Sequence, residues 1–243
     1  MKINAQKTQL IVLGSRQNLQ RLPPVTVQFM GAAVTGSTSV RNLGVMFDQC
    51  MTFSSHVSDL VQRCTGLLCG LAHSRHCLPQ SVLVTLVQGL VVSRIRYCIS
   101  VYGVTSQTEI GRLQKLLNFA ARVISGRRKF DHISDVLRNL NWLSSDGLYQ
   151  YHALTLLHRI LSSNMPESLA ACLTTRRDIH QHCTRQSEQL VTPRIRTEAG
   201  RRRFLYSAVN TYNGLPVDLR ALAPGRFKPA VRTYLLESQN GVT

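Results

Sequence analysis

The sequence predicts an α+β fold, in which a small strand-rich N-terminal piece precedes a mainly α-helical body. Two observations carry this prediction. Up to about residue 50, apolar residues come in short runs or alternate with period two, as they do in strands. From Ser54 onward they recur every three or four residues, as on one face of a helix. The pattern divides the chain into three stretches, 1–50, 54–173 and a basic stretch at 174–243.

Three strands are expected in the first stretch, separated by two turn-rich segments, Arg16–Pro24 and Gly31–Ser39. The strands are Thr8–Leu13, Val25–Met30 and Val40–Phe47. The first is a continuous apolar run, which suits a strand buried on both faces. Because so small a sheet is only marginally stable alone, we expect the chain to be a piece of a larger protein.

Helical spacing begins at Ser54 and is predicted to continue to about His76. A second helix is expected from Gln80 to about Arg94; it is apolar nearly all round and is therefore predicted to be central. A third begins at Ser106, which forms a capping box with Glu109, and ends at Gly126.

Shorter elements are expected beyond the third helix. Asp131–Leu140 reads as a short helix, and a longer one starts at Ser144 or Ser145 and ends before Asn164. The segment 174–203 contains eight arginines and three acids, so we expect it to be solvated, with a short strand at Gln189–Ile195. Two short helices are predicted near Arg201–Tyr212 and Arg226–Leu236, and Trp142 is predicted to lie in the core.

Charge is the strongest global feature of the sequence. Lysine and arginine total 29 against 12 acids, which gives a net charge of +17, and only five of the 29 are lysine. So basic a chain predicts a polyanionic partner, with nucleic acid ahead of acidic proteins or a membrane surface. Arginine favours nucleic acid further, since its guanidinium forks onto phosphate and stacks on bases.

Three basic clusters lie next to aromatic residues and are the candidate contacts with a nucleic-acid backbone. The neighbouring aromatics are Tyr97, Phe130 and Phe204. The polar face of the helix from Ser106 adds three more cations. The candidate residues are Arg94, Arg96, Arg112, Lys115, Arg122, Arg127, Arg128, Lys129, Arg201, Arg202 and Arg203. Each cluster equally suits a solvated helix end, where cations complement the helix dipole.

Other chemistries have weaker support. No nucleophile-elbow or phosphate-loop motif is present, and no apolar run is long enough to span a membrane as a helix. Asp131, His132 and Asp135 could form a hydrolytic site, but acids in a first helical turn are explained by the helix dipole. The seven cysteines form no CxxC pair and are predicted to be reduced and buried, so no metal site is expected. Without a secretory leader, a cytoplasmic or nuclear location is expected.

An ordered set of motifs along nearly the whole chain resembles the carboxyl-terminal half of the reverse transcriptase of non-LTR (LINE-type, jockey-like) retrotransposons. The set begins with Asn4-x-x-Lys7-Thr8 and the strand to Gly14. It continues with VRNLGVMFDQCMTFSSHV (40–57), SRIRYCISVYG (93–103), RLQKLLNFAARVISG (112–126), HI (132–133), LNWL (140–143), RRRFLYSAVNTYNGLP (201–216) and FKPAVRTYL (227–235).

The resemblance implies roles for particular residues. Residues 4–14 look like the last palm motif of such polymerases, in which the lysine, here Lys7, lies near the triphosphate and helps to protonate the leaving pyrophosphate. Residues 40–48 resemble the primer grip, with Leu43 and Gly44 as the matching residues. The helices that follow resemble a thumb, which binds template and product duplex. At Tyr212 the family usually has tryptophan.

The same resemblance implies that the full-length enzyme uses Mg²⁺ held by paired aspartates. No two acids are adjacent in this sequence, so we expect no cofactor in this chain and no polymerase activity from it. The expected partners are RNA and DNA, bound as template and primer without sequence preference. The alternative interpretation is a domesticated helical module that binds protein and not nucleic acid.

Overall fold

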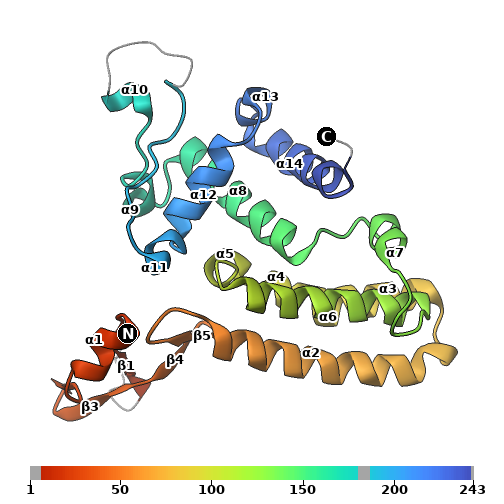
Figure 1. Ribbon diagram of the computed structural model, residues 1–243, viewed down its shortest axis with the longest axis horizontal. Coiled ribbons are helices and arrows are strands. Elements are labelled where there is room, and N and C mark those ends of the chain that lie inside the picture. The colour runs from red at the N-terminus through yellow and green to blue at the C-terminus, as the bar shows by residue number, and fades with distance from the viewer. Residues whose placement is uncertain (1–6, 180–186, 242–243) are drawn as a thin grey trace.

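The computed structural model describes residues 7–179 and 187–241 (Figure 1). A strand-rich head (residues 7–50) lies at one end of a layer of helices formed by α2 to α6, and a second group of helices around α8 covers that layer from above. The predicted fold class, a small strand-rich start followed by a helical body, is confirmed. The division into three stretches stays a prediction.

The first sheet of the head has the strand order β1-β3-β2. Strands β2 (Thr26–Phe29) and β3 (Ala32–Ser37) form an antiparallel hairpin, and β1 (Leu10–Ile11) pairs with β3 in parallel. At the hairpin tip both Met30 and Gly31 have positive φ, as a tight two-residue hairpin turn requires.

Three expectations for the head were wrong. The segment Gly31–Ser39 contains strand β3, whose weak strand composition is overridden by pairing with strands on both sides. The segment Arg16–Pro24 contains a helix, α1 (Arg16–Arg21), capped by the Ser15 hydroxyl, which accepts from the Asn18 N–H at 3.3 Å. Strand β1 is only half-buried, and Leu13 beyond it is 55% exposed, so it is not buried on both faces.

The expected third strand, Val40–Phe47, is also wrong, because it is a hairpin of two strands. Strand β4 (Ser39–Asn42) pairs with β5 (Val45–Asp48), and Leu43 and Gly44 form the turn with φ of 45° and 85°. Gly44 therefore marks a turn that favours positive φ at both central positions, not a bulge within a strand.

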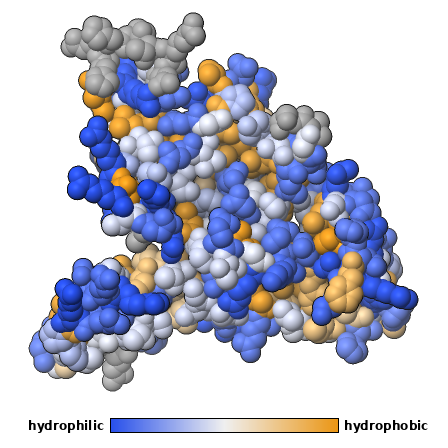
Figure 2. All heavy atoms as spheres, in the orientation of Figure 1, coloured by the Kyte–Doolittle hydropathy of each residue, from blue (hydrophilic) through white to orange (hydrophobic). Residues whose placement is uncertain are grey.

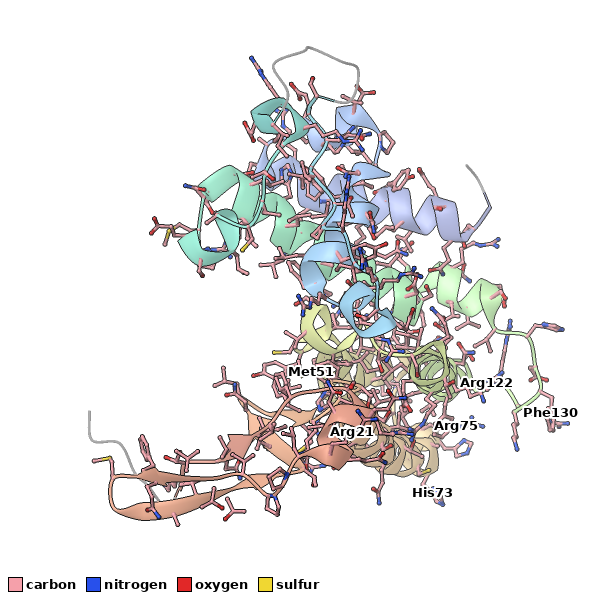
Figure 3. The ribbon with its side chains drawn as sticks, turned by 60° about the vertical axis from the view of Figure 1, so that its left-hand side comes forward. Arg21, Met51, His73, Arg75, Arg122 and Phe130 are labelled. Carbon is pink, nitrogen blue, oxygen red and sulfur yellow. The ribbon has the colours of Figure 1, made fainter. Side chains whose placement is uncertain are left out.

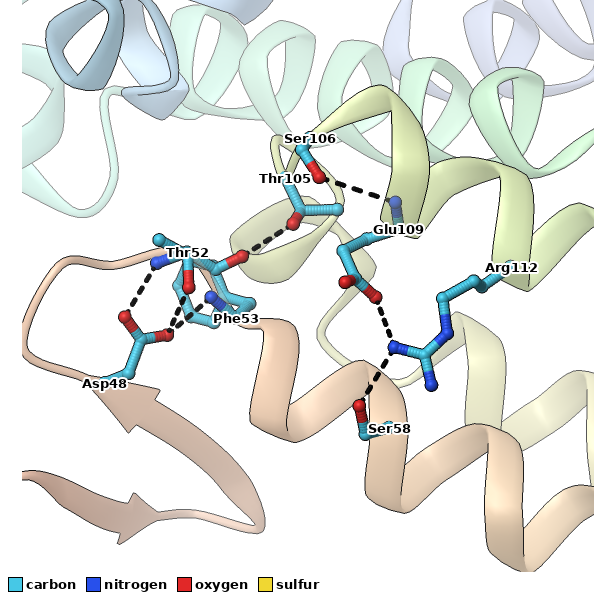
Figure 4. Close-up of polar contacts among 8 residues, drawn as sticks. All are labelled: Asp48, Thr52, Phe53, Ser58, Thr105, Ser106, Glu109 and Arg112. Carbon is cyan, nitrogen blue, oxygen red and sulfur yellow. Dashed lines mark hydrogen bonds and ion pairs between the residues drawn. The ribbon is translucent and has the colours of Figure 1, made fainter.

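The carboxylate of Asp48 organises the passage from β5 into the first long helix (Figure 4). It accepts hydrogen bonds from the backbone N–H groups of Cys50, Thr52 and Phe53 at 3.1, 3.0 and 2.6 Å, and from the Thr52 hydroxyl at 3.1 Å. The helix has no side-chain cap from its own N-cap residue, Phe53. Asp48 thus supplies the negative charge that a helix N-terminus favours.

The helical layer has α2 (Ser54–Ser74) and α6 (Gln107–Ser125) as its long members. A 3₁₀ turn, η2 (Arg75–Cys77), follows α2. Between them, α3 (Gln80–Val87), a π-helical turn η3 (Gln88–Val92) and α4 (Ser93–Arg96) form one continuous helix, followed by α5 (Ile99–Tyr102).

The predicted first and third helices are confirmed. Helix α6 starts at Ser106, whose hydroxyl accepts from the Glu109 N–H at 3.4 Å, and stops at Gly126 in the left-handed region. The second predicted helix runs two residues beyond Arg94. It is not buried all round, since Val82 and Leu90 are 40% and 37% exposed. Its other face packs on α2 and α6 through Leu83, Val87, Val91 and Ile95.

Beyond α6, the short helix α7 (Ser134–Asn139) begins three residues later than expected, because the Asp131 carboxylate accepts from the Arg128 N–H at 2.7 Å and shapes a turn. Helix α8 (Ser145–Ser163) begins and ends as predicted, with Ser144 as its N-cap and Asn164 as its C-cap. Trp142, 7% exposed, lies in the core as predicted.

The C-terminal part surrounds α8 with short helices. They are α9 (Glu167–Ala170), α10 (Arg176–Ile179), α11 (Glu198–Arg201), α12 (Phe204–Asn213), α13 (Val217–Arg220) and α14 (Pro224–Gln239). The expected strand Gln189–Ile195 was wrong, since within it only Leu190 makes a single bridge, to Thr175. The helix expected at Arg201–Tyr212 is divided between α11 and α12.

His158 joins α8 to α12 and α14. Its Nε2 lies 2.9 Å from the Leu222 carbonyl, which can only accept, so Nε2 carries the hydrogen and Nδ1 accepts from the Tyr212 hydroxyl at 3.1 Å. The imidazole stacks on Phe227 with ring centroids 3.8 Å apart. Burial lowers the pKa of His158, which keeps the ring neutral in this cluster.

The six cysteines in the described part of the chain are free thiols, as predicted, and Cys183 lies outside the described residues. The expectation that they are buried was wrong for Cys69, Cys77 and Cys172, which are exposed. Among helices of the described residues, none is both long and apolar enough for a membrane span.

Candidate nucleic-acid interface

A pocket of about 550 Å³ lies where the end of α2 meets the C-terminal half of α6 and the loop after it. We call it the α6 basic pocket. Its lining residues are Ala72, Arg75, Lys115, Phe119, Arg122, Val123, Arg127 and Lys129. In Figure 3, Arg75, Arg122 and Phe130 lie at this end of the helical layer. The structure thus brings together four of the predicted contact residues, Lys115, Arg122, Arg127 and Lys129.

Helix geometry explains this gathering. Lys115, Phe119 and Arg122 are four and three residues apart, so they follow one another along one face of α6. Ala72 and Arg75 have the same relation at the end of α2. Sequence reasoning missed Arg75 and Phe119. The spacing on α6 could have identified Phe119, whereas Arg75 reaches the pocket only because α2 packs on α6.

The charges of the pocket are not balanced locally. Five cations line it, and no carboxylate is among its lining residues. Arg127 is nevertheless paired outside the lining with Asp135, which it contacts with both ends of its guanidinium. This ion pair lowers the pKa of Asp135. The other four cations have no carboxylate partner among the ion pairs of the described residues.

Two of these four, Arg75 and Arg122, lie at the C-terminal end of α6. A Cβ placed on Gly126, the C-cap of that helix, would lie 3.6 Å from the Arg75 Nη1, so the Arg75 guanidinium sits beside the negative end of the helix dipole. Arg122 donates from Nη2 to the Asp131 carbonyl at 3.3 Å. Its Nε is buried and has no hydrogen-bond partner in the described part of the chain.

Lys129 and Phe130 lie beside the pocket. The Lys129 Nζ is 5.5 Å from the centre of the Phe130 ring, which is within the range of a cation–π contact. Phe130 is 88% exposed, and Figure 3 shows it projecting from the α6–α7 loop. An exposed aromatic ring next to cations can stack on a base.

A second region surrounds the β4–β5 turn. The Tyr97 hydroxyl donates to the Leu43 carbonyl at 2.7 Å, and a Cβ on Gly44 would lie 3.5 Å from the Tyr97 ring. An aromatic ring thus approaches the backbone closely at Gly44. Leu43 is 81% exposed, so its side chain is free to contact a ligand.

The neighbours of Tyr97, Arg94 and Arg96, diverge. Arg94 is exposed and close enough to Cys64 to lower its pKa in part, although burial raises the pKa of that thiol overall. Arg96 lines a hollow of about 150 Å³ with Arg232 and Trp142. The Arg232 Nη2 donates to the Asn141 carbonyl at 3.0 Å, so this hollow belongs to the packing of α14.

A third region is a cleft of about 670 Å³ between the head and the C-terminal helices, visible as the deep hollow on the left side of Figure 2. Its walls are mainly apolar and include Met51, Phe53 and Phe204. Arg202 and Arg203 line it, whereas Arg201 is exposed outside the lining.

Two of the predicted contact residues, Arg112 and Arg128, make hydrogen bonds that stabilise the fold. Arg112 donates from Nη1 to Glu109 Oε2 and to Ser58 Oγ, both at 2.9 Å, and so joins α6 to α2 (Figure 4). Arg128 lies in the turn that Asp131 shapes and is not among the lining residues of the α6 basic pocket. Their contact with nucleic acid stays a prediction, as it does for the other candidate residues.

The remaining sequence candidates are dispersed. Lys7 is exposed at the start of the described chain. In the hydrolytic candidate, Asp135 is bound by Arg127 and Asp131 by the Arg128 backbone, so the two carboxylates are engaged separately. Among the described residues, no three His, Cys, Asp or Glu side chains could jointly hold a metal ion. These residues therefore do not fit the Mg²⁺ that the resemblance implies for the full-length enzyme.

Sequence comparison adds one relationship to this geometry. A probable RNA-directed DNA polymerase from the transposon X-element of Drosophila melanogaster is 28% identical to the chain over 125 residues. The match covers 50% of this chain and 14% of that protein. No family model matches the chain, and no solved structure matches it. The chain is therefore related to the reverse transcriptases of retrotransposons, and its length corresponds to a fraction of such an enzyme.

Proposed function

We propose that the chain is the end of the palm, the primer grip and the thumb-like region of a retrotransposon reverse transcriptase, and that it binds RNA and DNA through the sugar-phosphate backbone. The observation that carries the proposal is the α6 basic pocket, which gathers five cations from α6, the loop after it and the end of α2, with no carboxylate in its lining. Like charges held together cost free energy unless a counter-charge binds them. Phosphates supply that counter-charge.

The sequence relationship supports the same proposal, because the related protein is described as a polymerase that is directed by RNA. The net charge of +17 supports sequence-independent binding, which is driven mainly by release of counterions from phosphates. Under this proposal, Leu43 and Gly44 at the β4–β5 turn contact the primer end, and the protein acts in the cytoplasm or nucleus.

The test is binding of a labelled single strand and a labelled duplex, measured by fluorescence anisotropy between about 50 and 200 mM salt. The logarithm of the affinity should fall linearly with the logarithm of the salt concentration. The double variant Lys115→Gln/Arg122→Gln should weaken binding and reduce the slope by about 0.7 to 0.9 for each phosphate that the variant no longer neutralises.

The matched control is Arg16→Gln/Arg21→Gln, which also removes two positive charges, from exposed positions on α1 at the opposite end of the molecule (Figure 1). It should leave affinity and slope nearly unchanged. If both double variants weaken binding equally, the pocket is not the contact site. If the folded chain binds neither probe, the alternative interpretation, a protein-interaction module, replaces this proposal.

The second part of the proposal is that these 243 residues alone do not polymerise. Primer extension with Mg²⁺ and all four nucleotides tests it. No extension is expected, because the chain has no adjacent acids. Incorporation of nucleotides that requires a carboxylate of this chain would contradict it.

A further inference from the structure

The α6 basic pocket has a feature that phosphate binding does not require. A strip of cations on an open surface would be sufficient to follow a phosphate backbone. Here the cations surround a hollow of about 550 Å³, which is within the usual range of pockets for small organic ligands. Its walls include the apolar side chains of Ala72, Phe119 and Val123. The ligand that fills it should therefore have an apolar body as well as negative charge.

Two groups in the wall indicate what kind of body this is. The ring of Phe119 is partly buried and lines the pocket, which provides an aromatic surface for a flat ligand. Arg122 also lines the pocket, and its guanidinium is a fork of N–H donors that suits acceptors at the edge of such a ligand. A planar group with hydrogen-bond acceptors at its edge matches both residues.

We propose that the α6 basic pocket takes one unstacked nucleotide of a single strand, with the base against Phe119 and the flanking phosphates on Arg75, Lys115 and Lys129. A nucleobase has the flat face, the edge acceptors and the adjacent negative charge that the pocket matches. This inference rests on the proposed function and specifies its ligand. The exposed ring of Phe130 beside Lys129 offers a stacking surface to the next base.

The proposal predicts a preference for single strands. In a duplex each base is paired and stacked, and placing one in the pocket requires extrusion from the helix, which costs a few kcal/mol. A single strand has a much smaller cost, since its bases are already accessible. The preference should depend on the presence of a base and not on the sequence, because every base has a π-face.

The experiment compares three labelled probes on the full chain: a single strand, a strand of equal length and charge without bases, and a duplex. The base-bearing strand should bind about tenfold more tightly than the abasic strand, as loss of one stacked base predicts. The variant Phe119→Leu, which retains apolar packing, should remove most of this difference, leaving the smaller contribution of stacking on Phe130, and should leave abasic binding unchanged. Phe29→Leu, at a partly buried phenylalanine of strand β2 that lines none of the pockets described above, is the matched control and should retain it.

The outcomes separate this inference from the proposed function. If the abasic and base-bearing strands bind equally, the nucleotide pocket is overturned while backbone binding stands. If no probe binds, both fail. If thermal melting shows that Phe119→Leu is folded, and the variant keeps the full difference in affinity between the base-bearing and abasic strands, the inference is overturned. Should that variant unfold, Arg122→Lys decides: it keeps the charge but removes the planar guanidinium, and it should weaken binding of the base-bearing strand alone.

Discussion

The two ends of helix α6 carry the same kind of side chain in opposite roles. At its N-terminal end Arg112 donates to Glu109 and Ser58, and its charge is used to join α6 to α2. Near its C-terminal end Arg122 lies in a pocket without carboxylates, and its Nε has no partner in the described chain. Both arginines belong to the polar face of one amphipathic helix, so charge and periodicity alone do not distinguish them.

The difference comes partly from Glu109, which lies one turn before Arg112 on α6, and partly from the α2 residues that face each end. The beginning of α2 follows the Asp48 turn, and there Ser58 and Glu109 meet Arg112; Thr105 also donates to the Thr52 carbonyl at 2.6 Å (Figure 4). The end of α2 brings Arg75, a further cation, toward Arg122. At one end of the α2–α6 pair, the arginine is therefore bound by side chains of the protein. At the other end, the cations face no carboxylate in the pocket lining and can bind an anion.

The largest effect on stability should come from removing the Asp48 carboxylate, which binds the backbone at the N-terminus of α2. Asp48→Ala leaves three backbone N–H groups without their acceptor, and we expect the free energy of unfolding to fall by about 3 kcal/mol. Urea unfolding measures this, with Asp218→Ala as the control, because that exposed acid lies in the first turn of the short helix α13. Folded Asp48→Ala protein should retain its nucleic-acid affinity; a stability loss no larger than that of the control would contradict the role of Asp48.

Acid pH should lower the free energy of unfolding without changing the charge of Arg112 or Arg122. Burial, together with Arg96 and Lys228, lowers the pKa of His152 to about 4 from its ordinary value of 6.5. Below pH 6.5 the unfolded chain therefore binds a proton that the folded chain does not, so stability falls as the pH drops from 6.5 to 4 and is fully present above 6.5. The loss should be on the order of 2 kcal/mol, allowing for partial exposure of the ring.

Denaturant unfolding at a series of pH values measures this loss. The buried histidines His56 and His158, whose pKa values are also lowered, add to the slope in the same direction. In His152→Gln the pH dependence between 4 and 6.5 should become shallower. An identical slope in that variant would show that His152 does not cause the loss.

Exchanging arginine for glutamine at each end of α6 compares the two roles directly. Arg112→Gln should lower the free energy of unfolding by about 1 kcal/mol, because Glu109, whose side chain is 10% exposed, loses its ion pair. It should weaken nucleic-acid binding less than Arg122→Gln does. Arg122→Gln should change stability by no more than about 0.5 kcal/mol but weaken binding. The reverse pattern, measured by urea unfolding and anisotropy, would remove the distinction between the two ends.

The smallest effect on stability should come from Phe130→Ala. The ring is 88% exposed and contacts Lys129, so its loss should change the free energy of unfolding by no more than about 0.5 kcal/mol. Affinity for a single strand should fall about twofold to fivefold, since a weak stacking surface is removed. Equal affinity of this variant and the unmodified chain would confine base contact to the interior of the pocket.

Helix limits were predictable because their signals are local. Ser106, Gly126, Ser144 and Asn164 cap α6 and α8 through bonds to residues within a turn of themselves. Strand limits in the head were not, since β3 has weak strand composition and forms only through its pairing with β1 and β2. The same distinction applies to the site: Lys115 and Arg122 were predicted from one helix face, whereas Arg75 joined them through packing between helices.

The sequence by itself determined the α+β class, the main helices, the excess of arginine and the relationship to retrotransposon reverse transcriptases. These properties depend on amino-acid composition, on the spacing of apolar residues and on local helix capping. Each segment has such features whether or not it packs against other segments. Only the tertiary structure decided that Arg112 also binds Ser58 of α2, that Arg122 lies with Arg75 in a pocket without carboxylates, and that Leu43 is held at Tyr97. Such contacts join residues distant in sequence, and their free energy exists only when the helices and the hairpin pack together.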